Sequence, residues 1–193
     1  MSDTIRILGI PGSLRRGSYN HAALRAAQAL APDVGAEIAI FTLEDIPAFN
    51  EDQLGTLPPR VRALRAALAT SDAVLFATPE YNYSVPGVLK NAIDWVSRPA
   101  AESAWRGKPV AVLGASGGLL GTVRAQYHLR QIFVFLDMPA LNQPEVMIAR
   151  AREKFDAQGT LTDADTRRRI QDLVAALVAW TRRLAAGTSP GRT

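Results

Sequence analysis

The sequence predicts an α/β protein built on a five-stranded parallel sheet with helices on both faces. Three observations lead to this prediction. Short apolar segments alternate with amphipathic helical segments along the chain, the apolar segments are continuous rather than alternating, and several end in turns rich in glycine, serine or proline. No linker, repeat or low-complexity stretch divides the chain, so we expect a single domain over residues 1–186 and a flexible tail over residues 187–193.

Five apolar segments are the expected strands. The first ends at the turn-forming pair Pro11-Gly12, and the last is the shortest. Because a parallel strand is covered on both faces, its residues read as one apolar run rather than as a period of two. The segments cover residues 5–10, 36–41, 73–77, 109–113 and 146–148.

Segments of helical periodicity follow the strands and supply the right-handed crossovers that parallel strands need. They cover residues 18–30, 58–68, 84–96, 121–136 and 162–184. Ser84 is expected to cap the third helix, with Pro86 in the first turn, where its missing N–H costs nothing. Thr162 and Asp165 predict a start for the last helix that resembles a capping box.

The composition excludes several kinds of site. The chain has no cysteine, which removes disulfides, thiolate nucleophiles, iron–sulfur clusters and cysteine-ligated zinc. Its two histidines, His21 and His128, are too few for a histidine-rich centre, so we expect no metal site. The chain shows no basic segment followed by an apolar leader, and no apolar run of about 18 residues. We therefore expect a cytoplasmic protein without membrane association.

The charge balance is mildly positive, +4 at pH 7, from 22 Lys plus Arg against 18 Asp plus Glu. Arginine dominates the basic residues and is the side chain that grips phosphate or carboxylate with two hydrogen bonds. The densest basic run, residues 167–169, lies on a helix that also carries a clean apolar stripe. We interpret this run as a solvated helix face and expect no nucleic-acid partner.

The loop at residues 12–20 joins the first strand to a helix N-terminus, where free N–H groups favour an anion. Gly12 and Gly17 have the spacing of a P-loop, but the following lysine is missing, which disfavours nucleoside triphosphate hydrolysis. The G-x-G-x-x-G pattern of a dinucleotide site is also absent. A plain turn with a solvated arginine remains the alternative. The residues that suit a phosphate monoester are Ser13, Arg15, Ser18 and Asn20.

Two further loops follow the third and fourth strands, at the same edge of the expected sheet. Residues 78–86 combine two tyrosines, an amide, a carboxylate and two prolines, which make a stiff wall suited to a flat heteroaromatic ring. Residues 114–121 are nearly bare of side chains, so the backbone there can approach a ligand closely and donate N–H groups to it. Each loop alone is also consistent with ordinary packing or turn formation. All three at one sheet edge indicate a ligand site.

These three motifs together resemble the NAD(P)H-dependent FMN reductase family, including its quinone and chromate reductase members. The resemblance extends over roughly residues 5 to 180 and is most specific in the long middle motif. The first motif begins with Gly12-Ser-Leu-Arg and ends with Gly-Ser-Tyr-Asn20. The second begins with Pro79-Glu-Tyr-Asn-Tyr and ends with Ile-Asp-Trp95. The third begins with Gly114-Ala-Ser-Gly-Gly and ends at Gly121.

The resemblance implies a flavodoxin-like fold, bound FMN, and NADPH or NADH as electron donor. The residues implied to hold the FMN phosphate are Ser13, Arg15, Ser18 and Asn20. Those implied to line the flavin ring are Pro79, Glu80, Tyr81, Asn82 and Tyr83. Ser116, Gly117 and Gly118 would approach the far edge of the ring.

The resemblance implies an enzyme that passes two electrons through FMN to a small-molecule acceptor, with the flavin supplying the chemistry and no separate catalytic side chain. A quinone, an azo compound, a metal oxyanion and free flavin all remain open as acceptor. The alternative is a flavodoxin-like electron carrier that binds FMN without oxidising NAD(P)H. A signalling receiver domain is disfavoured, because no acidic cluster for Mg²⁺ follows the first strand.

The sequence also predicts a homodimer or homotetramer. Within the helix at residues 121–136, one apolar stripe already faces the expected core, yet Tyr127, Val134 and Phe135 fall outside it. A helix that is apolar on more than one side usually has a second partner. The family resemblance likewise implies dimers or tetramers.

Overall fold

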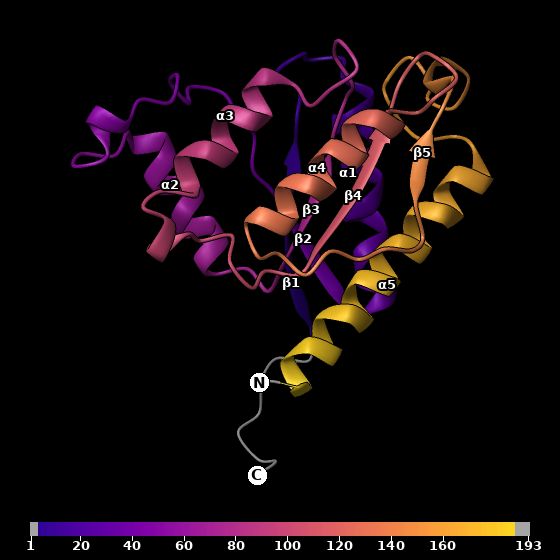
Figure 1. The fold of residues 1–193 in the computed structure, drawn as a ribbon. Coiled ribbons are helices and arrows are strands. Elements are labelled where there is room, and N and C mark those ends of the chain that lie inside the picture. Colours follow the sequence, from indigo (N-terminus) through magenta and orange to yellow (C-terminus); the bar gives the residue numbers. More distant parts are fainter. Residues whose placement is uncertain (1–3, 188–193) are drawn as a thin grey trace.

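The computed structural model describes residues 4–187 and confirms the predicted α/β architecture (Figure 1). Its five strands pair in parallel in the order β2-β1-β3-β4-β5. The strands are β1 (Ile5–Pro11), β2 (Ala36–Ile40), β3 (Ala73–Ala77), β4 (Val110–Ala115) and β5 (Val146–Ile148). The apolar runs therefore predicted every strand, with small differences at the ends of β1, β2 and β4.

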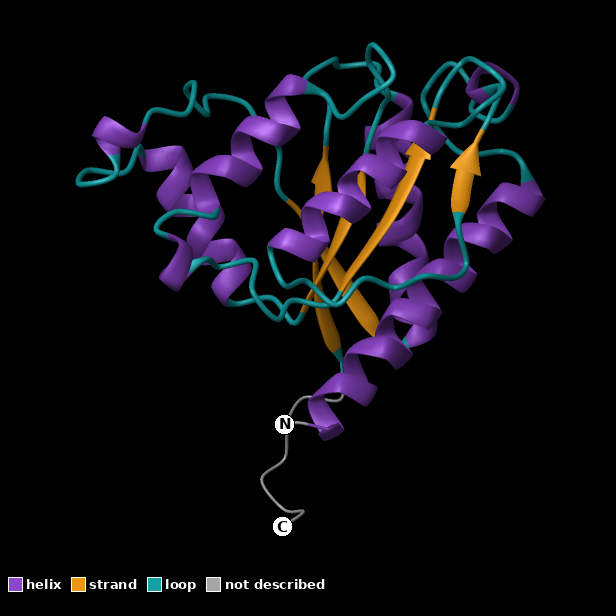
Figure 2. Ribbon diagram, in the orientation of Figure 1, coloured by secondary structure: helices purple, strands orange, loops and turns teal. Residues whose placement is uncertain are grey.

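Helices cover both faces of the sheet (Figure 2). One face packs against α1 and α5, and the opposite face packs against α2, α3 and α4. The helices are α1 (Tyr19–Leu30), α2 (Pro59–Ala69), α3 (Gly87–Val96), α4 (Val123–Phe135) and α5 (Ala164–Gly187). Short 3₁₀ turns lie at η1 (Ala31–Val34), η2 (Glu51–Gln53), η3 (Ala100–Glu102) and η4 (Ala151–Glu153).

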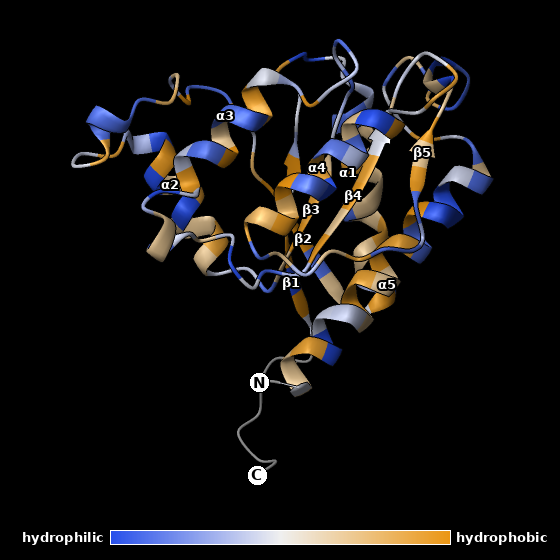
Figure 3. Cartoon of the chain, viewed as in Figure 1, coloured by the Kyte–Doolittle hydropathy of each residue, from blue (hydrophilic) through white to orange (hydrophobic). Residues whose placement is uncertain are grey.

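Each strand contributes to two cores, because successive side chains point to opposite faces of a sheet. In β3, Leu75 packs on the α1 and α5 side, whereas Val74 and Phe76 pack on the side of α2, α3 and α4. All residues of β3 have no exposed surface. Figure 3 shows the apolar colouring of the strands against the more hydrophilic outer faces of the helices. Burial on both faces explains the continuous apolar runs in the sequence.

The helices begin one to three residues later than predicted, and two predicted caps are wrong. Helix α3 begins at Gly87 without a side-chain cap, and Pro86 is its N-cap residue rather than part of its first turn. The Ser84 hydroxyl instead lies 2.9 Å from Nδ1 of His128 on α4. Helix α5 is capped by Asp163, whose carboxylate accepts a hydrogen bond from the backbone N–H of Thr166 at 2.8 Å. Hydrogen bonds from Thr166 and Lys154 lower the pKa of Asp163 to about 2. Both cap predictions are wrong for the same reason. A serine or threonine near a helix start can form hydrogen bonds with partners that the sequence does not show.

The predicted tail begins at Gly187, which is the last residue of α5, and its remaining residues, 188–193, lie outside the described part of the chain. None of the helices within residues 4–187 has the length and apolar character needed to cross a membrane.

Candidate functional site

The three loops singled out from the sequence meet in one cleft of about 260 Å³ at the carboxyl ends of β1, β3 and β4. The chain leaves β1 toward β2 on one side and continues through β3, β4 and β5 on the other. The strand order therefore reverses between β1 and β3, and ligands of open α/β sheets bind outside such a point.

Most of the predicted site residues line this cleft, namely Ser13, Arg15, Ser18, Asn20, Pro79, Glu80, Tyr81, Ser116 and Gly117. Asn82, Tyr83 and Gly118 are not among the residues that line it. The cleft also includes Tyr19, Ala115 and Arg152, which the sequence motifs did not single out as ligands. The three loops thus come together as predicted, and one further element contributes an arginine.

The first loop carries its serines at the N-terminus of α1. Ser18 caps that helix: its hydroxyl accepts hydrogen bonds from the backbone N–H groups of Asn20 and His21, at 3.2 and 3.4 Å. The Ser13 hydroxyl accepts the backbone N–H of Arg15 at 3.2 Å. The Arg15 guanidinium is exposed, lies 5.6 Å from the centre of the Tyr19 ring, and has no hydrogen bond or ion pair within residues 4–187. Arg15 is therefore available to an anion.

Asn20 joins two of the loops. Its side-chain amide donates to the carbonyl of Ala115 at 3.0 Å, and its side-chain oxygen accepts the backbone N–H of Ala115 at 2.9 Å. The residue is 3% exposed. This pair of hydrogen bonds fixes the N-terminus of α1 against the end of β4, next to the glycine-rich third loop.

The second loop contains a tight turn. Tyr81 and Ser84 exchange backbone hydrogen bonds at 3.1 and 2.9 Å around Asn82 and Tyr83, whose φ angles are +49° and +67°. Two consecutive left-handed residues match a type I′ turn, which asparagine tolerates better than tyrosine does. The turn leaves Tyr81 and Tyr83 51% and 69% exposed. Tyr81 is thereby presented along the cleft.

Glu80 anchors this loop to α4. Its carboxylate accepts hydrogen bonds from the backbone N–H groups of Arg124 and Ala125, at 3.0 and 3.3 Å, and from the Arg124 guanidinium, with which it also forms an ion pair. The side chain of the α4 N-cap residue, Thr122, accepts no capping hydrogen bond from the first turn of the helix. The Arg124 guanidinium in turn lies 3.4 Å from the centre of the Tyr83 ring. Glu80 therefore caps α4 from a distant loop and fixes the turn at the same time.

The Glu80 carboxyl is 8% exposed, and this burial by itself favours the neutral form. Hydrogen bonds from the Arg124 side chain and from the Ala125 backbone outweigh that effect and hold the pKa of Glu80 below its ordinary value. Glu80 is thus an ionised carboxylate engaged by its own chain, and its charge inside the cleft is balanced by Arg124.

The third loop is held by the segment after β5. Ser116 donates its backbone N–H to the carbonyl of Ile148 and accepts that of Ala151, at 3.0 and 2.9 Å, and Arg150 donates its own to the carbonyl of Gly118 at 2.9 Å. A methyl group added at Gly117 would meet no atom within 4 Å. The backbone there is open to close approach by a ligand, as the sequence suggested.

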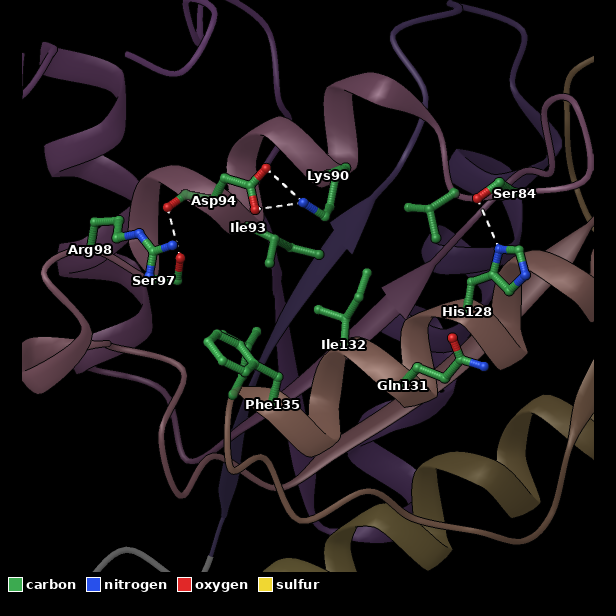
Figure 4. A pocket seen from close by; sticks show the side chains of 12 residues that line it. Ser84, Lys90, Ile93, Asp94, Ser97, Arg98, His128, Gln131, Ile132 and Phe135 are labelled. Atoms are coloured by element: carbon green, nitrogen blue, oxygen red, sulfur yellow. Dashed lines mark hydrogen bonds and ion pairs between the residues drawn. The ribbon is translucent and has the colours of Figure 1, made fainter. Parts of the chain in front are cut away.

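A larger hollow, of about 530 Å³, lies between α3 and α4 (Figure 4). Its walls include the apolar side chains of Ile93, Ile132 and Phe135 beside the ion pair of Lys90 with Asp94, whose atoms are 2.8 Å apart. None of the three motif loops contributes its glycines or its phosphate-type residues to this hollow. Size alone would favour it as the ligand site, but its chemistry does not match a phosphate and a flat ring.

The small cleft fits FMN by its own features. A phosphate monoester suits the N-terminus of α1 with its serines and the exposed Arg15, and a flat ring suits the exposed Tyr81 beside the open backbone of Gly117. The sheet order and the position of this cleft at the strand reversal define the class as a flavodoxin-like α/β protein with an FMN site.

Similarity to known proteins shows which family of this class the chain belongs to. A model of the NADPH-dependent FMN reductase family matches residues 5–153. An NAD(P)H-dependent FMN reductase of Pseudomonas aeruginosa is 57% identical over 95% of this chain and 99% of that protein. An NAD(P)H:quinone oxidoreductase of Solanum tuberosum is 45% identical over 91% of this chain and 92% of that protein.

The structural comparison agrees. The flavoenzyme NAD(P)H:(acceptor) oxidoreductase FerB from Paracoccus denitrificans superposes with a TM-score of 0.85, at 37% identity, over 93% of this chain and 98% of that one. The chain belongs to the NADPH-dependent FMN reductase family. It is an oxidoreductase that uses FMN as cofactor and NAD(P)H as electron donor.

Proposed function

We propose that the protein transfers two electrons from NAD(P)H through bound FMN to a quinone or a comparably flat acceptor. The observation that carries this proposal is the single cleft in which a phosphate-type loop, an exposed tyrosine wall and an open glycine backbone meet. Relatives named as quinone oxidoreductases support the choice of acceptor. The fold and the charge of the cleft support the cofactor.

Within this proposal, one end of the cleft holds the cofactor phosphate. Arg15 offers a cationic fork, and Ser13 and Ser18 offer hydroxyl groups at the N-terminus of α1, where the helix dipole favours negative charge. Asn20 lies at the same end, but its amide is bound to Ala115. We assign Asn20 to shaping the phosphate site. The second N–H of its side-chain amide can donate a hydrogen bond to the phosphate.

The other end of the cleft orients the ring. We assign Pro79, Tyr81 and the turn at Asn82 and Tyr83 to one wall, with Glu80 anchoring that wall through Arg124. Ser116 and Gly117 border the opposite edge, with Gly118 next in the same loop, and we assign the backbone N–H groups of the two glycines to stabilising negative charge on a reduced ring. FMN, when bound, supplies the hydride and electron transfer chemistry. The protein contributes binding, orientation and electrostatic stabilisation, without a separate catalytic side chain.

Steady-state kinetics test the proposed function. NADPH and benzoquinone, varied in turn against the FMN-loaded protein, are expected to give parallel double-reciprocal lines, because donor and acceptor use the same open face of the cleft one after the other. Little radical signal should appear by electron spin resonance during turnover. A protein that binds FMN but does not oxidise NADPH or NADH would instead be an electron carrier.

Cofactor titration gives a second test. The protein is expected to release about one FMN per chain on denaturation and to bind riboflavin, which lacks the phosphate, more weakly than FMN. The Arg15→Ala variant should lose about 1.5 to 3 kcal/mol of FMN affinity, the range for a hydrogen bond to a charged group. Fluorescence titration measures both. Equal affinities for riboflavin and FMN would contradict the phosphate site, and an unchanged affinity in Arg15→Ala would mean that this arginine is only solvated.

We also propose that the chain forms a homodimer or homotetramer through α4. Val134 and Phe135 are 82% and 75% exposed, and Tyr127 is 50% exposed on the same helix. Beside them lies the hollow between α3 and α4, which Phe135 itself borders (Figure 4). A second copy can place the same apolar residues into the same hollow, as a two-fold interface requires.

Light scattering at micromolar concentration is expected to give at least a dimeric mass. Phe135→Ser should shift the mass toward the monomer, because a large aromatic side chain is replaced by a small polar one at the centre of the contact. Leu119→Ser, at a 71% exposed leucine on the cleft loop, is the matched control and should leave the mass unchanged. A monomeric wild type would contradict the proposal.

We further propose that the protein works in the cytoplasm as one FMN-binding domain over residues 1–186. The absence of cysteine from the sequence is consistent with that compartment. A single cooperative unfolding transition and cytoplasmic fractionation of the tagged chain would support these two points.

A further inference from the structure

Arg152 is a second arginine in the cofactor cleft, supplied by η4 after the last strand. Like Arg15, it is exposed, and its guanidinium has no hydrogen bond or ion pair with any residue in the described range 4–187. By contrast, Arg124 is fully engaged by Glu80. Two uncommitted guanidinium groups, more than a hundred residues apart in the sequence, therefore border one cleft.

The backbone fixes where Arg152 lies. Ala151, directly before it, is completely buried and donates its N–H to the carbonyl of Ser116 at 2.9 Å. On the other side, the ring of Phe155 lies 5.6 Å from that of Tyr19, the first residue of α1. The turn that carries Arg152 is thus tied to the third loop and packed against the N-terminus of α1, which is the phosphate end of the cleft.

The charge of the cleft favours an anion that carries more than one negative charge. Glu80 is the single carboxylate among the lining residues, and Arg124 balances it. Arg15 and Arg152 are then two uncompensated positive charges. A phosphate monoester carries about 1.5 to 2 negative charges at pH 7, since its second pKa is about 6. One guanidinium and a helix N-terminus, worth about half a charge, supply about 1.5 positive charges together, which leaves up to about half a charge of the dianion unmatched.

We infer that Arg152 binds the phosphate group of FMN together with Arg15, so that the dianion lies between two guanidinium groups. The inference rests on the proposed function, because it assigns a residue to the same cofactor site. Its partners at that end are Ser13 and Ser18, which line the cleft with it. Arg152 is a binding residue in this assignment, with no part in electron transfer.

The test is a titration of flavin-free protein with FMN and with riboflavin, followed by quenching of flavin fluorescence. Arg152→Gln is expected to weaken FMN binding about 10- to 100-fold and to leave riboflavin binding within about twofold, since only FMN carries the charge. The FMN affinity of Arg152→Lys should lie between those of wild type and Arg152→Gln, because lysine keeps the positive charge but lacks the two-pronged hydrogen-bonding geometry of arginine. Arg150→Gln is the matched control: Arg150 is an exposed arginine of the same segment that does not line the cleft, and its replacement should change neither affinity.

Each other outcome has a definite meaning. If wild type binds FMN tightly and Arg152→Gln binds it equally well, the inference is wrong while the proposed function stands. An equal loss for FMN and riboflavin would show a general disturbance of the cleft and would also overturn it. Unchanged FMN affinity with a raised KM for NADPH would assign Arg152 to the pyridine nucleotide instead. A wild type that binds no FMN at all would remove the proposed function itself, and with it the site to which Arg152 is assigned.

Discussion

Gly114→Ala is expected to destabilise the fold by about 3 kcal/mol or more, the upper range for overpacking a buried site. A methyl group at Gly114 would lie 2.5 Å from the carbonyl oxygen of Thr78 and 1.8 Å from the hydroxyl oxygen of Thr122. The Thr122 side chain has room to turn only at the cost of its contact with Gln126, and the Thr78 carbonyl belongs to the backbone. The strands β3 and β4 would have to separate where the cleft begins.

Thermal unfolding measures this effect. A loss of about 3 kcal/mol corresponds to a fall in Tm of roughly 6 to 12 °C for a chain of this size. Gly87→Ala is the control, because a methyl group at the first residue of α3 meets nothing within 4 Å, and it should hold or slightly raise the Tm. An unchanged Tm in Gly114→Ala would mean that the strand ends adjust freely, which would contradict the close approach.

Glu80→Ala is expected to lower stability by about 2.5 to 4 kcal/mol and to weaken FMN binding as well. The substitution removes the cap of α4 and the charged hydrogen bonds of Arg124 together, which contribute about 1 kcal/mol and about 1.5 to 3 kcal/mol in comparable cases. It also releases the turn at Tyr81. Denaturant unfolding and FMN titration give the two readouts. Glu102→Ala is the control, since Glu102 is 71% exposed and lies 3.8 Å from Arg65, a pair worth less than about 1 kcal/mol.

The contribution of Glu80 depends on pH with a definite sign. Because the pKa of Glu80 in the folded protein lies below its ordinary value, the stabilisation is fully present above the unfolded pKa of about 4.3 and is lost as pH falls through the folded pKa. The stability difference between wild type and Glu80→Ala should therefore be constant near neutral pH and shrink in acid. A difference that grew toward low pH would contradict an ionised Glu80.

The sequence predicted the sheet well because its signal is local. Buried parallel strands such as β3 must be apolar at every position, and the ligand loops follow strand ends that any five-stranded parallel sheet brings to one edge. Ser13, Arg15 and Ser18 could be selected for the same reason, since loop and helix start are adjacent in the chain.

What the sequence did not predict depends on contacts between distant residues. The motif predicts that Glu80 lines the flavin ring, yet its carboxylate caps α4, more than forty residues away in the sequence. Ser84 similarly bonds His128 rather than capping α3. Arg152 lies in a stretch without a recognisable motif. The backbone hydrogen bond from Ala151 to Ser116 holds this stretch beside the cleft, which Arg152 therefore lines. A sequence pattern specifies which side chains are present along one element, whereas these roles are set by how elements pack.

The double hydrogen bond between Asn20 and Ala115 has a kinetic consequence. It holds the two sides of the cleft together through groups of the protein alone, so the binding geometry exists before the cofactor arrives. A ligand that meets a ready-made site needs no ordering step, and its arrival is limited by encounter. Stopped-flow mixing of flavin-free protein with FMN should accordingly show one exponential whose rate rises linearly with FMN concentration, without a plateau.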